Sequence, residues 1–263
     1  MRIWQAILLG LVQGFTEFLP VSSSGHLLLI ERWLKIDTGG GLFFDIMLHL
    51  GTLIPVCAVF FDGIKGLFVK PYKTLLYLII ATLPAVAAGL LLQDKIEYLY
   101  KGGTVLSAAL LSLSFLLTAA ELFFAEKTSQ KNKNALPLSA KSSIIMGVFQ
   151  GFAVIPGLSR SGTVITGGAV SGLKNDKNAE FAFLMSIPVI LGAALISGVK
   201  TVSQGAAIDL LPTVFGVVSA AVSGHIAVGV MLKAVKKAKY GRFSAYLVLV
   251  AVLSLLTKIL FGV

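Results

Sequence analysis

Long apolar stretches dominate the chain and predict helices that cross a membrane. Six of them stand uninterrupted: 43–61, 74–92, 104–125, 179–198, 208–232 and 244–262. An α-helix needs about 20 apolar residues to cross the hydrocarbon core of a bilayer, and each stretch is close to that length. The alternation of apolar and polar residues that a barrel strand requires is missing from them, so we expect an all-α membrane protein with six spans.

Two further apolar stretches, 3–34 and 142–172, are interrupted by polar residues. The breaks fall at 17–26 and 155–162, and both are rich in proline, glycine and serine. Each half of a stretch is too short to cross a membrane alone. Such halves are typical of a re-entrant hairpin, in which two short helices enter and leave on the same side.

The two broken stretches are copies of one unit. A shift of 137 positions without gaps aligns eight identical residues: Ile7 with Ile144, Gly10 with Gly147, Gln13 with Gln150, Gly14 with Gly151, Phe15 with Phe152, Ser22 with Ser159, Ser24 with Ser161 and Gly25 with Gly162. We therefore expect one membrane domain, 1–263, made of repeats 1–137 and 138–263. Three spans follow each hairpin, and because three is odd, the second repeat would be inverted in the membrane, with the two breaks meeting near the midplane.

Small residues four positions apart occur in two corresponding spans. They are Ala81, Ala85 and Gly89 in one span and Gly216, Ala220 and Gly224 in the other. Small side chains let helix backbones approach closely in lipid, so we expect tight helix packing at these positions.

Composition and charge agree with a membrane protein. Hydrophobic residues make up 56% and charged ones 13%, whereas a soluble domain has about 45–50% and about 25%. The net charge of +10 is explained by lysine-rich loops rather than by a nucleic-acid partner: 14 of the 22 Lys and Arg residues would lie on one side and seven on the other, with Arg160 in the second break. The richer side should be cytoplasmic, which puts both termini outside. The single cysteine, Cys57, excludes an internal disulfide.

Polar side chains of the first break form a candidate anion site. Gln13 and Glu17 share one helix face, and Pro20 ends that helix. The following serines, Ser22, Ser23 and Ser24, open the next helix with His26 close behind. Hydroxyls and free N–H groups at a helix N-terminus, together with the helix dipole, attract anions.

The second break offers a matching set of donors at a helix start: Ser159, Arg160, Ser161, Gly162 and Thr163. A guanidinium fork matches phosphate, and glycine allows close approach of the backbone. Two such cradles facing each other predict a phosphate or diphosphate ligand. Glu17 fits beside phosphate if it binds a metal ion or handles a proton, and His26 could orient or deprotonate a serine.

Simpler interpretations exist for each residue taken alone. The serines could serve only as helix caps, Arg160 could extend to the membrane interface, and Glu17 could lie near a membrane surface. We interpret His49 and His225 as structural, and Asp45 as either a surface residue or part of the site. The joint occurrence of polar groups in both breaks favours a functional site.

The two breaks resemble the signatures of the undecaprenyl-diphosphate phosphatases, also called bacitracin-resistance proteins. Residues 13–26, QGFTEFLPVSSSGH, are similar to the first signature and residues 156–162, PGLSRSG, to the second. Patches at 44–52 and 183–188 extend the resemblance over the whole chain. Gln13 stands where the family signature also accepts glutamate, so Glu17 is the motif acid here. Threonine falls at Thr163, one position earlier than in the family pattern.

The resemblance implies a membrane hydrolase that removes the terminal phosphate of undecaprenyl diphosphate and recycles the lipid carrier for cell-wall synthesis. It also implies a divalent cation, Mg²⁺ or Ca²⁺, and an active site open to the outer face of the cell membrane. In our hypothesis Ser23 attacks phosphorus, with His26 as its base or orienting group. Arg160, Ser159 and Ser161 hold the diphosphate, and Glu17 binds the metal or moves a proton with help from Gln13. Ser22, Ser24, Gly162 and Thr163 complete the expected substrate contacts.

Three alternatives stay open at this level. Inverted repeats with broken helices are also typical of transporters, so a lipid-carrier flippase is the rival function. A purely structural scaffold leaves the two polar breaks unexplained. The sequence does not decide between a phosphoserine intermediate and direct attack by water, nor between a monomer and a homodimer.

Overall fold

The structure is a computed structural model, and it describes residues 1–36, 38, 42–131, 136–203 and 209–262. These ranges form eleven helices: α1 (Ile3–Phe18), α2 (Ser23–Leu34), α3 (Leu42–Val59), α4 (Phe61–Leu67), α5 (Lys73–Lys101), α6 (Val105–Lys131), α7 (Ala140–Phe152), α8 (Arg160–Val170), α9 (Asn175–Ser203), α10 (Leu210–Lys236) and α11 (Gly241–Phe261). The one extended pairing in the described ranges is an isolated bridge between Leu136 and Leu173. The prediction of an all-α protein is confirmed.

Five helices are long and apolar enough to cross a membrane: α5, α6, α9, α10 and α11. The remaining expected span, 43–61, is almost entirely α3; α3 and the following α4 meet at an angle of 85° and reach the required length only together. The described residues thus hold five such helices, or six if the bent pair counts as one, as in a multi-pass membrane protein.

Each broken stretch forms two short helices, as its sequence predicts. Helix α1 ends at Phe18 because proline disfavours helical backbone in the residue before it, and Leu19 before Pro20 is extended. Helix α2 then begins at Ser23, and α8 begins at Arg160 after the second break. The breaks thus separate α1 from α2 and α7 from α8 by turns of a few residues.

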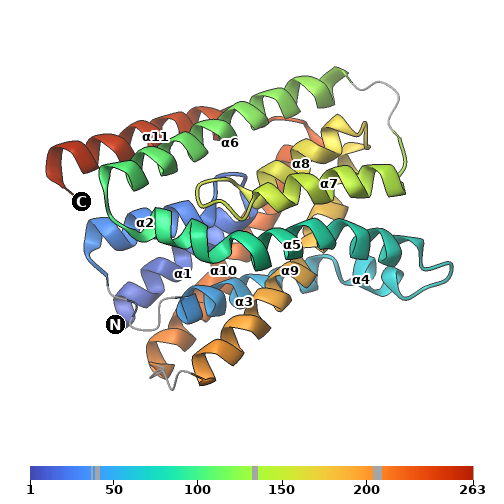
Figure 1. Ribbon diagram of the computed structural model, residues 1–263. Coiled ribbons are helices and arrows are strands. Elements are labelled where there is room, and N and C mark those ends of the chain that lie inside the picture. The colour runs from blue at the N-terminus through green and yellow to red at the C-terminus, as the bar shows by residue number, and fades with distance from the viewer. Residues whose placement is uncertain (37, 39–41, 132–135, 204–208, 263) are drawn as a thin grey trace.

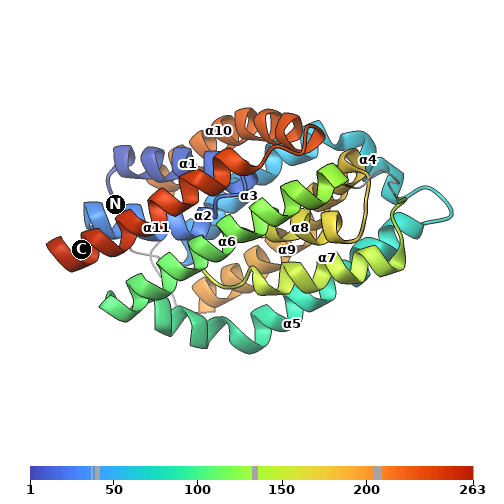
Figure 2. The same cartoon turned by 90° about the horizontal axis from the view of Figure 1, so that it is seen from above.

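The halves of the chain are interleaved. Figures 1 and 2 show α6 and α11 lying side by side along one edge of the molecule. Helix α1 of the first half packs on α10 of the second, and α7 of the second half packs on α5 of the first. The short helices α2 and α8 are held inside this frame, and α8 contacts α6, α7 and α9.

Glycines let the short helices pack closely on the long ones. A Cβ on Gly10 would lie 2.3 Å from the Gly216 carbonyl oxygen, and one on Gly147 would lie 2.7 Å from the Ala81 carbonyl oxygen. Close packing at the small residues of α5 and α10 is therefore confirmed for Ala81 and Gly216. The expectation of close packing is wrong for Gly89, where a Cβ would meet no atom within 4 Å.

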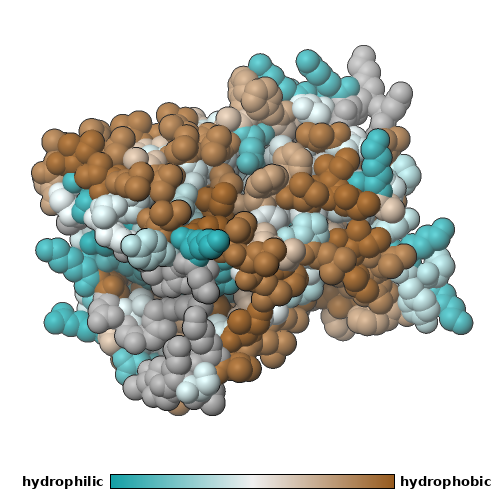
Figure 3. Space-filling model, viewed as in Figure 1, coloured by the Kyte–Doolittle hydropathy of each residue, from teal (hydrophilic) through white to brown (hydrophobic). Residues whose placement is uncertain are grey.

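The outer surface is apolar along the sides of the bundle. Figure 3 shows hydrophobic residues over most of one face, with hydrophilic residues gathered mainly toward the two ends of the view. On α5 the side chains of Leu90 and Leu91 are 69% and 74% exposed. An apolar surface of this extent is unfavourable in water and suits contact with lipid.

Replacing Gly14 by alanine should destabilise the protein, because the new Cβ would lie 2.4 Å from the Ala220 carbonyl oxygen of α10. We expect a loss of about 1–3 kcal/mol, typical of overpacking. Gly89→Ala is the matched control, since its Cβ would enter open space. Thermal unfolding in detergent measures both variants, and equal melting temperatures for the two would contradict the close contact of α1 and α10.

Candidate functional site

The two breaks lie against each other, as predicted. Ser161 Oγ donates a hydrogen bond of 3.1 Å to the Leu19 carbonyl oxygen of the first break. A Cβ on Gly162 would lie 3.4 Å from Pro20 Cβ, which shows how closely the turns approach. Residues 142 positions apart in sequence thus share one site.

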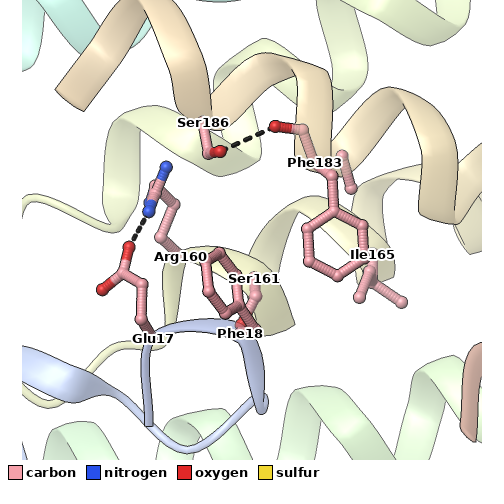
Figure 4. Close-up of a pocket in the computed structure, with 8 residues that line it drawn as sticks. Glu17, Phe18, Arg160, Ser161, Ile165, Phe183 and Ser186 are labelled. Carbon is pink, nitrogen blue, oxygen red and sulfur yellow. Dashed lines mark hydrogen bonds and ion pairs between the residues drawn. The ribbon is translucent and has the colours of Figure 1, made fainter. Parts of the chain in front are cut away.

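Glu17 is the centre of this site, and its side chain is only 3% exposed. Its Oε2 accepts hydrogen bonds from Ser23 Oγ at 2.6 Å and from Gln13 Nε2 at 2.9 Å. Its Oε1 forms an ion pair with the Arg160 guanidinium, drawn as a dashed line in Figure 4. The structure therefore brings together four of the residues that the sequence singles out: Gln13, Glu17, Ser23 and Arg160.

Ser23 and Arg160 occupy equivalent places in the two halves. Each is the first residue of its short helix, α2 or α8, and the two are 137 positions apart. Because the N-terminus of a helix carries about half a positive charge, the Glu17 carboxylate lies where two such ends converge. The same arrangement would attract a phosphate group.

A small hollow of about 20 Å³ adjoins the ion pair, room for roughly one water molecule. Figure 4 shows its lining, in which Arg160 and Glu17 face Ser186 of α9. Nη1 of Arg160 is buried and has no hydrogen-bond partner among the described residues. A buried guanidinium with an unused donor is suited to an incoming oxyanion.

Other predicted site residues have partners within their own turns. Ser22 Oγ and Ser159 Oγ accept from the backbone N–H groups of Gly25 and Gly162, at 3.3 and 3.2 Å, so both act as helix caps. Thr163 is 1% exposed and donates to the Arg160 carbonyl oxygen at 3.0 Å. Ser24 is exposed, and its hydroxyl lies 3.5 Å from that of Ser22.

His26 is bonded to groups other than Ser23. Its Nδ1 lies 2.7 Å from the Ser22 carbonyl oxygen, and its Nε2 lies 2.8 Å from the Tyr246 hydroxyl. Ser22 itself has a φ of +68°, a conformation that costs a non-glycine residue on the order of 1–3 kcal/mol. The hydroxyl of Ser23 instead donates to Glu17.

His49 belongs to the site, although its sequence context indicates a structural residue. Its Nε2 lies 3.4 Å from Glu17 Oε2, and its Nδ1 is 2.7 Å from the Asp45 carbonyl oxygen. The repeat could have identified it: a shift of 137 positions aligns His49 with Ser186, which lines the hollow beside Arg160. Nothing in the sequence signals Tyr246, which is 220 positions from His26.

The described residues contain no group of three or more His, Cys, Asp or Glu side chains that could hold a metal ion. Glu17 provides one carboxylate. Mg²⁺ commonly keeps several waters and binds through one or two carboxylates together with substrate phosphates. The donor set therefore fits an ion that is shared between Glu17 and a bound diphosphate.

These features define an integral membrane protein with a buried ion pair at the place where the two polar breaks meet. Comparison with known proteins then specifies the family: the family model of bacitracin resistance protein BacA matches residues 6–253, and the chain belongs to this family. A protein named undecaprenyl-diphosphatase from Carboxydothermus hydrogenoformans is 42% identical over 250 residues, 94% of each chain. Proteins of the same name from Halothermothrix orenii and Methanobrevibacter smithii are each 36% identical, covering 96–97% and 96% of the chains.

Removing one partner of the Glu17–Arg160 pair should destabilise the fold by about 3–5 kcal/mol, because it leaves a buried charge without compensation. The double variant Glu17→Gln/Arg160→Gln should lose less than the sum of the single variants. Lys177→Gln is the control: it breaks the more exposed pair with Glu180, for which we expect about 0–1 kcal/mol. Additive losses in a double-mutant cycle of unfolding in detergent would contradict the pairing.

Proposed function

We propose that this protein hydrolyses undecaprenyl diphosphate to undecaprenyl phosphate and inorganic phosphate. It thereby recycles the lipid carrier for cell-wall synthesis and confers bacitracin resistance. Membership of the BacA family and the names of its relatives support this function. The observation that carries it is the contact of one carboxylate with both Ser23 and Arg160, at the N-termini of two helices.

The ion pair gives the substrate a way to activate the site. The hollow is too small for a diphosphate, so the site has to widen when substrate binds. The unused Nη1 of Arg160 would bind a phosphate oxygen first, and the guanidinium would then exchange Glu17 for a second one. A guanidinium binds phosphate as readily as carboxylate, with two parallel hydrogen bonds. The exchange leaves Glu17 without its counter-ion and therefore more basic, while it still accepts the hydrogen bond from Ser23.

Ser23 is then the nucleophile, and Glu17 is its base. The Ser23 oxygen forms a bond to the terminal phosphorus as its proton passes to Glu17 over the 2.6 Å contact. The bond from that phosphorus to the bridging oxygen breaks, and undecaprenyl phosphate leaves. Water hydrolyses the phosphoserine, releasing inorganic phosphate and restoring the hydroxyl.

This assignment moves the base from His26 to Glu17. Both nitrogens of His26 have other partners, whereas Glu17 contacts Ser23 directly. His49 Nε2 lies 3.4 Å from Glu17 Oε2. The imidazole would stabilise the carboxylate and help it to hold the proton that it takes from Ser23. Arg160 and Ser161 stabilise the charge that develops on the transferred phosphoryl group.

A divalent cation, Mg²⁺ or Ca²⁺, is part of the proposal. The diphosphate oxygens would hold the ion, and it would neutralise phosphate charge. Glu17 would be a ligand of the ion only in place of its role as the base, because a carboxylate bound to a cation is less basic. Ser22, Ser24, Ser159, Gly162 and Thr163 would support the site mainly by shaping the two helix ends.

The inverted repeat with two re-entrant hairpins is the architecture that we propose for this site. Corresponding helices begin 137 positions apart: α1 and α7 at Ile3 and Ala140, and α5 and α10 at Lys73 and Leu210. The exchanged packing of α1 on α10 and of α7 on α5 supports a two-fold relation between repeats 1–137 and 138–263. The lysine distribution supports an outward-facing first hairpin, both termini outside and a site open to the outer face.

Purified protein in detergent should release inorganic phosphate from undecaprenyl diphosphate when Mg²⁺ or Ca²⁺ is present and lose activity in EDTA. Glu17→Gln and Ser23→Ala should each lower kcat by about 100-fold or more. Arg160→Lys should lose about as much, because a point charge does not replace a bidentate fork. Lys177→Gln, far from this chemistry, should keep normal activity.

The outcomes separate the parts of the proposal. No release by folded wild-type protein with either cation would refute the hydrolase. Full activity of Arg160→Lys would remove the phosphate-binding role of Arg160. Phosphate that becomes labelled on Ser23 during turnover supports the serine nucleophile, whereas unimpaired turnover by Ser23→Ala would show that water attacks directly.

Single cysteines test the orientation. In a Cys57→Ala background, cysteines placed at Arg2 and Lys258 should react with a membrane-impermeant maleimide in intact cells, and one at Lys70 should react only after lysis. Labelling of Lys70→Cys in intact cells with protection of the other two would reverse the proposed topology.

A further inference from the structure

We propose that Tyr246 is a positioning residue for the reaction, acting on Ser23 through His26. The inference rests on the proposed hydrolase and concerns α11, a helix that contributes no residue to the hollow beside Arg160. It is carried by a series of contacts that runs from Tyr246 to His26, to the Ser22 carbonyl and to the peptide bond of Ser23.

The ring of His26 is held by two aromatic contacts and two hydrogen bonds. Its ring stacks on that of Tyr246 with centroids 5.6 Å apart and an angle of 11° between the planes. Phe115 of α6 meets it edge-on at 5.4 Å. With its two nitrogens bonded to the Ser22 carbonyl and the Tyr246 hydroxyl, the ring has a single favourable orientation.

The partners define the tautomer of the neutral ring. A carbonyl oxygen only accepts, so Nδ1 carries the hydrogen that His26 donates to Ser22. Nε2 is then the acceptor, and the Tyr246 hydroxyl donates to it. The Ser22 carbonyl alone already favours the Nδ1–H tautomer, and the Tyr246 hydroxyl stabilises this tautomer further by donating to Nε2. Without the hydroxyl the ring loses one of the two side-chain hydrogen bonds that fix its position.

The Ser22 carbonyl matters because it belongs to the same peptide plane as the Ser23 N–H. In a trans peptide these two groups point in opposite directions. The two bonds that His26 donates to this carbonyl, from its backbone N–H at 3.2 Å and from Nδ1 at 2.7 Å, therefore hold the direction of the Ser23 N–H together. This N–H is one of the unpaired donors at the start of α2, where the phosphate would bind. Ser22 also has a strained φ of +68°, so the turn relies on its hydrogen bonds to keep this conformation.

A merely structural hydrogen bond between α2 and α11 already exists elsewhere. Trp33 Nε1 donates to Thr257 Oγ1 at 3.0 Å, at the opposite end of α2 from the serine turn. Loss of this bond removes one contact between the same two helices without touching the turn. Thr257→Val is therefore the matched control for Tyr246→Phe.

The first experiment compares the kinetics of these two variants with wild type. Tyr246→Phe should lower kcat by about 3- to 10-fold, the range that one hydrogen bond supplies, with little change in KM. Thr257→Val should keep kcat within about twofold while its melting temperature changes as much as that of Tyr246→Phe. Equal kcat values for Tyr246→Phe and wild type would overturn the inference, whereas inactive wild type would refute the hydrolase instead.

A double-mutant cycle tests whether Tyr246 acts through His26. In a His26→Ala background, Tyr246→Phe should lower kcat by less than about twofold more, because its connection to Ser22 is already gone. Losses that multiply would show that the hydroxyl acts by another route and would overturn the inference.

Nitrogen NMR of ¹⁵N-histidine-labelled protein gives a readout that needs no turnover. The chain has three histidines, and His26→Ala assigns the signal of His26. Wild type should show the Nδ1–H tautomer with a hydrogen-bonded Nε2. Tyr246→Phe should keep this tautomer, while the Nε2 signal moves to the position of a nitrogen that accepts no hydrogen bond. A wild-type signal from the Nε2–H tautomer would overturn the inference whether or not the protein hydrolyses the lipid.

Discussion

The pairing of Glu17 with Arg160 is the interaction on which the rest of the structure depends. A carboxylate and a guanidinium that are both largely removed from solvent are unfavourable unless each compensates the other. Their contact requires the turn after α1 and the start of α8 to meet, and this contact connects the two halves of the chain at one point. Three features allow the two turns to come this close: the glycines of the turns, the serine caps of α2 and α8, and the packing of α6 against them.

The site owes its chemistry to differences between two similar halves. Position 17 is glutamate in the first half and valine at the equivalent position 154 in the second. Ser23 corresponds in the same way to Arg160, and His49 to Ser186. In the proposed mechanism each half offers only part of the set: a nucleophile and its base from one, and the phosphate-binding fork from the other. The proposed site is therefore asymmetric although the two sequences around it are similar.

Much of this could be predicted from the sequence, because apolar length and proline position are local signals. The long helices and both broken stretches follow from them directly, and the shift of 137 positions placed Ser23 and Arg160 on matching helix starts. The contacts of single side chains were harder to predict from the sequence. His26 looked like the base for Ser23 from its spacing of three, yet its partners come from Ser22 and from Tyr246, 220 positions away. Similarly, the 85° bend after Val59 falls at the end of the apolar stretch 43–61, just before Asp62 and Gly63, and the sequence does not show that a short helix follows at this angle.

The close contact of α1 with α10 has a consequence for biogenesis. Helix α1 leaves the ribosome before α10, and the surface that accepts Gly10 and Gly14 is synthesised about 200 residues later. Until then the polar turn after α1 has neither its guanidinium partner nor its helix support. During translation α1 and α2 therefore lack these contacts until α8 and α10 have been made, and the site takes shape only late in synthesis.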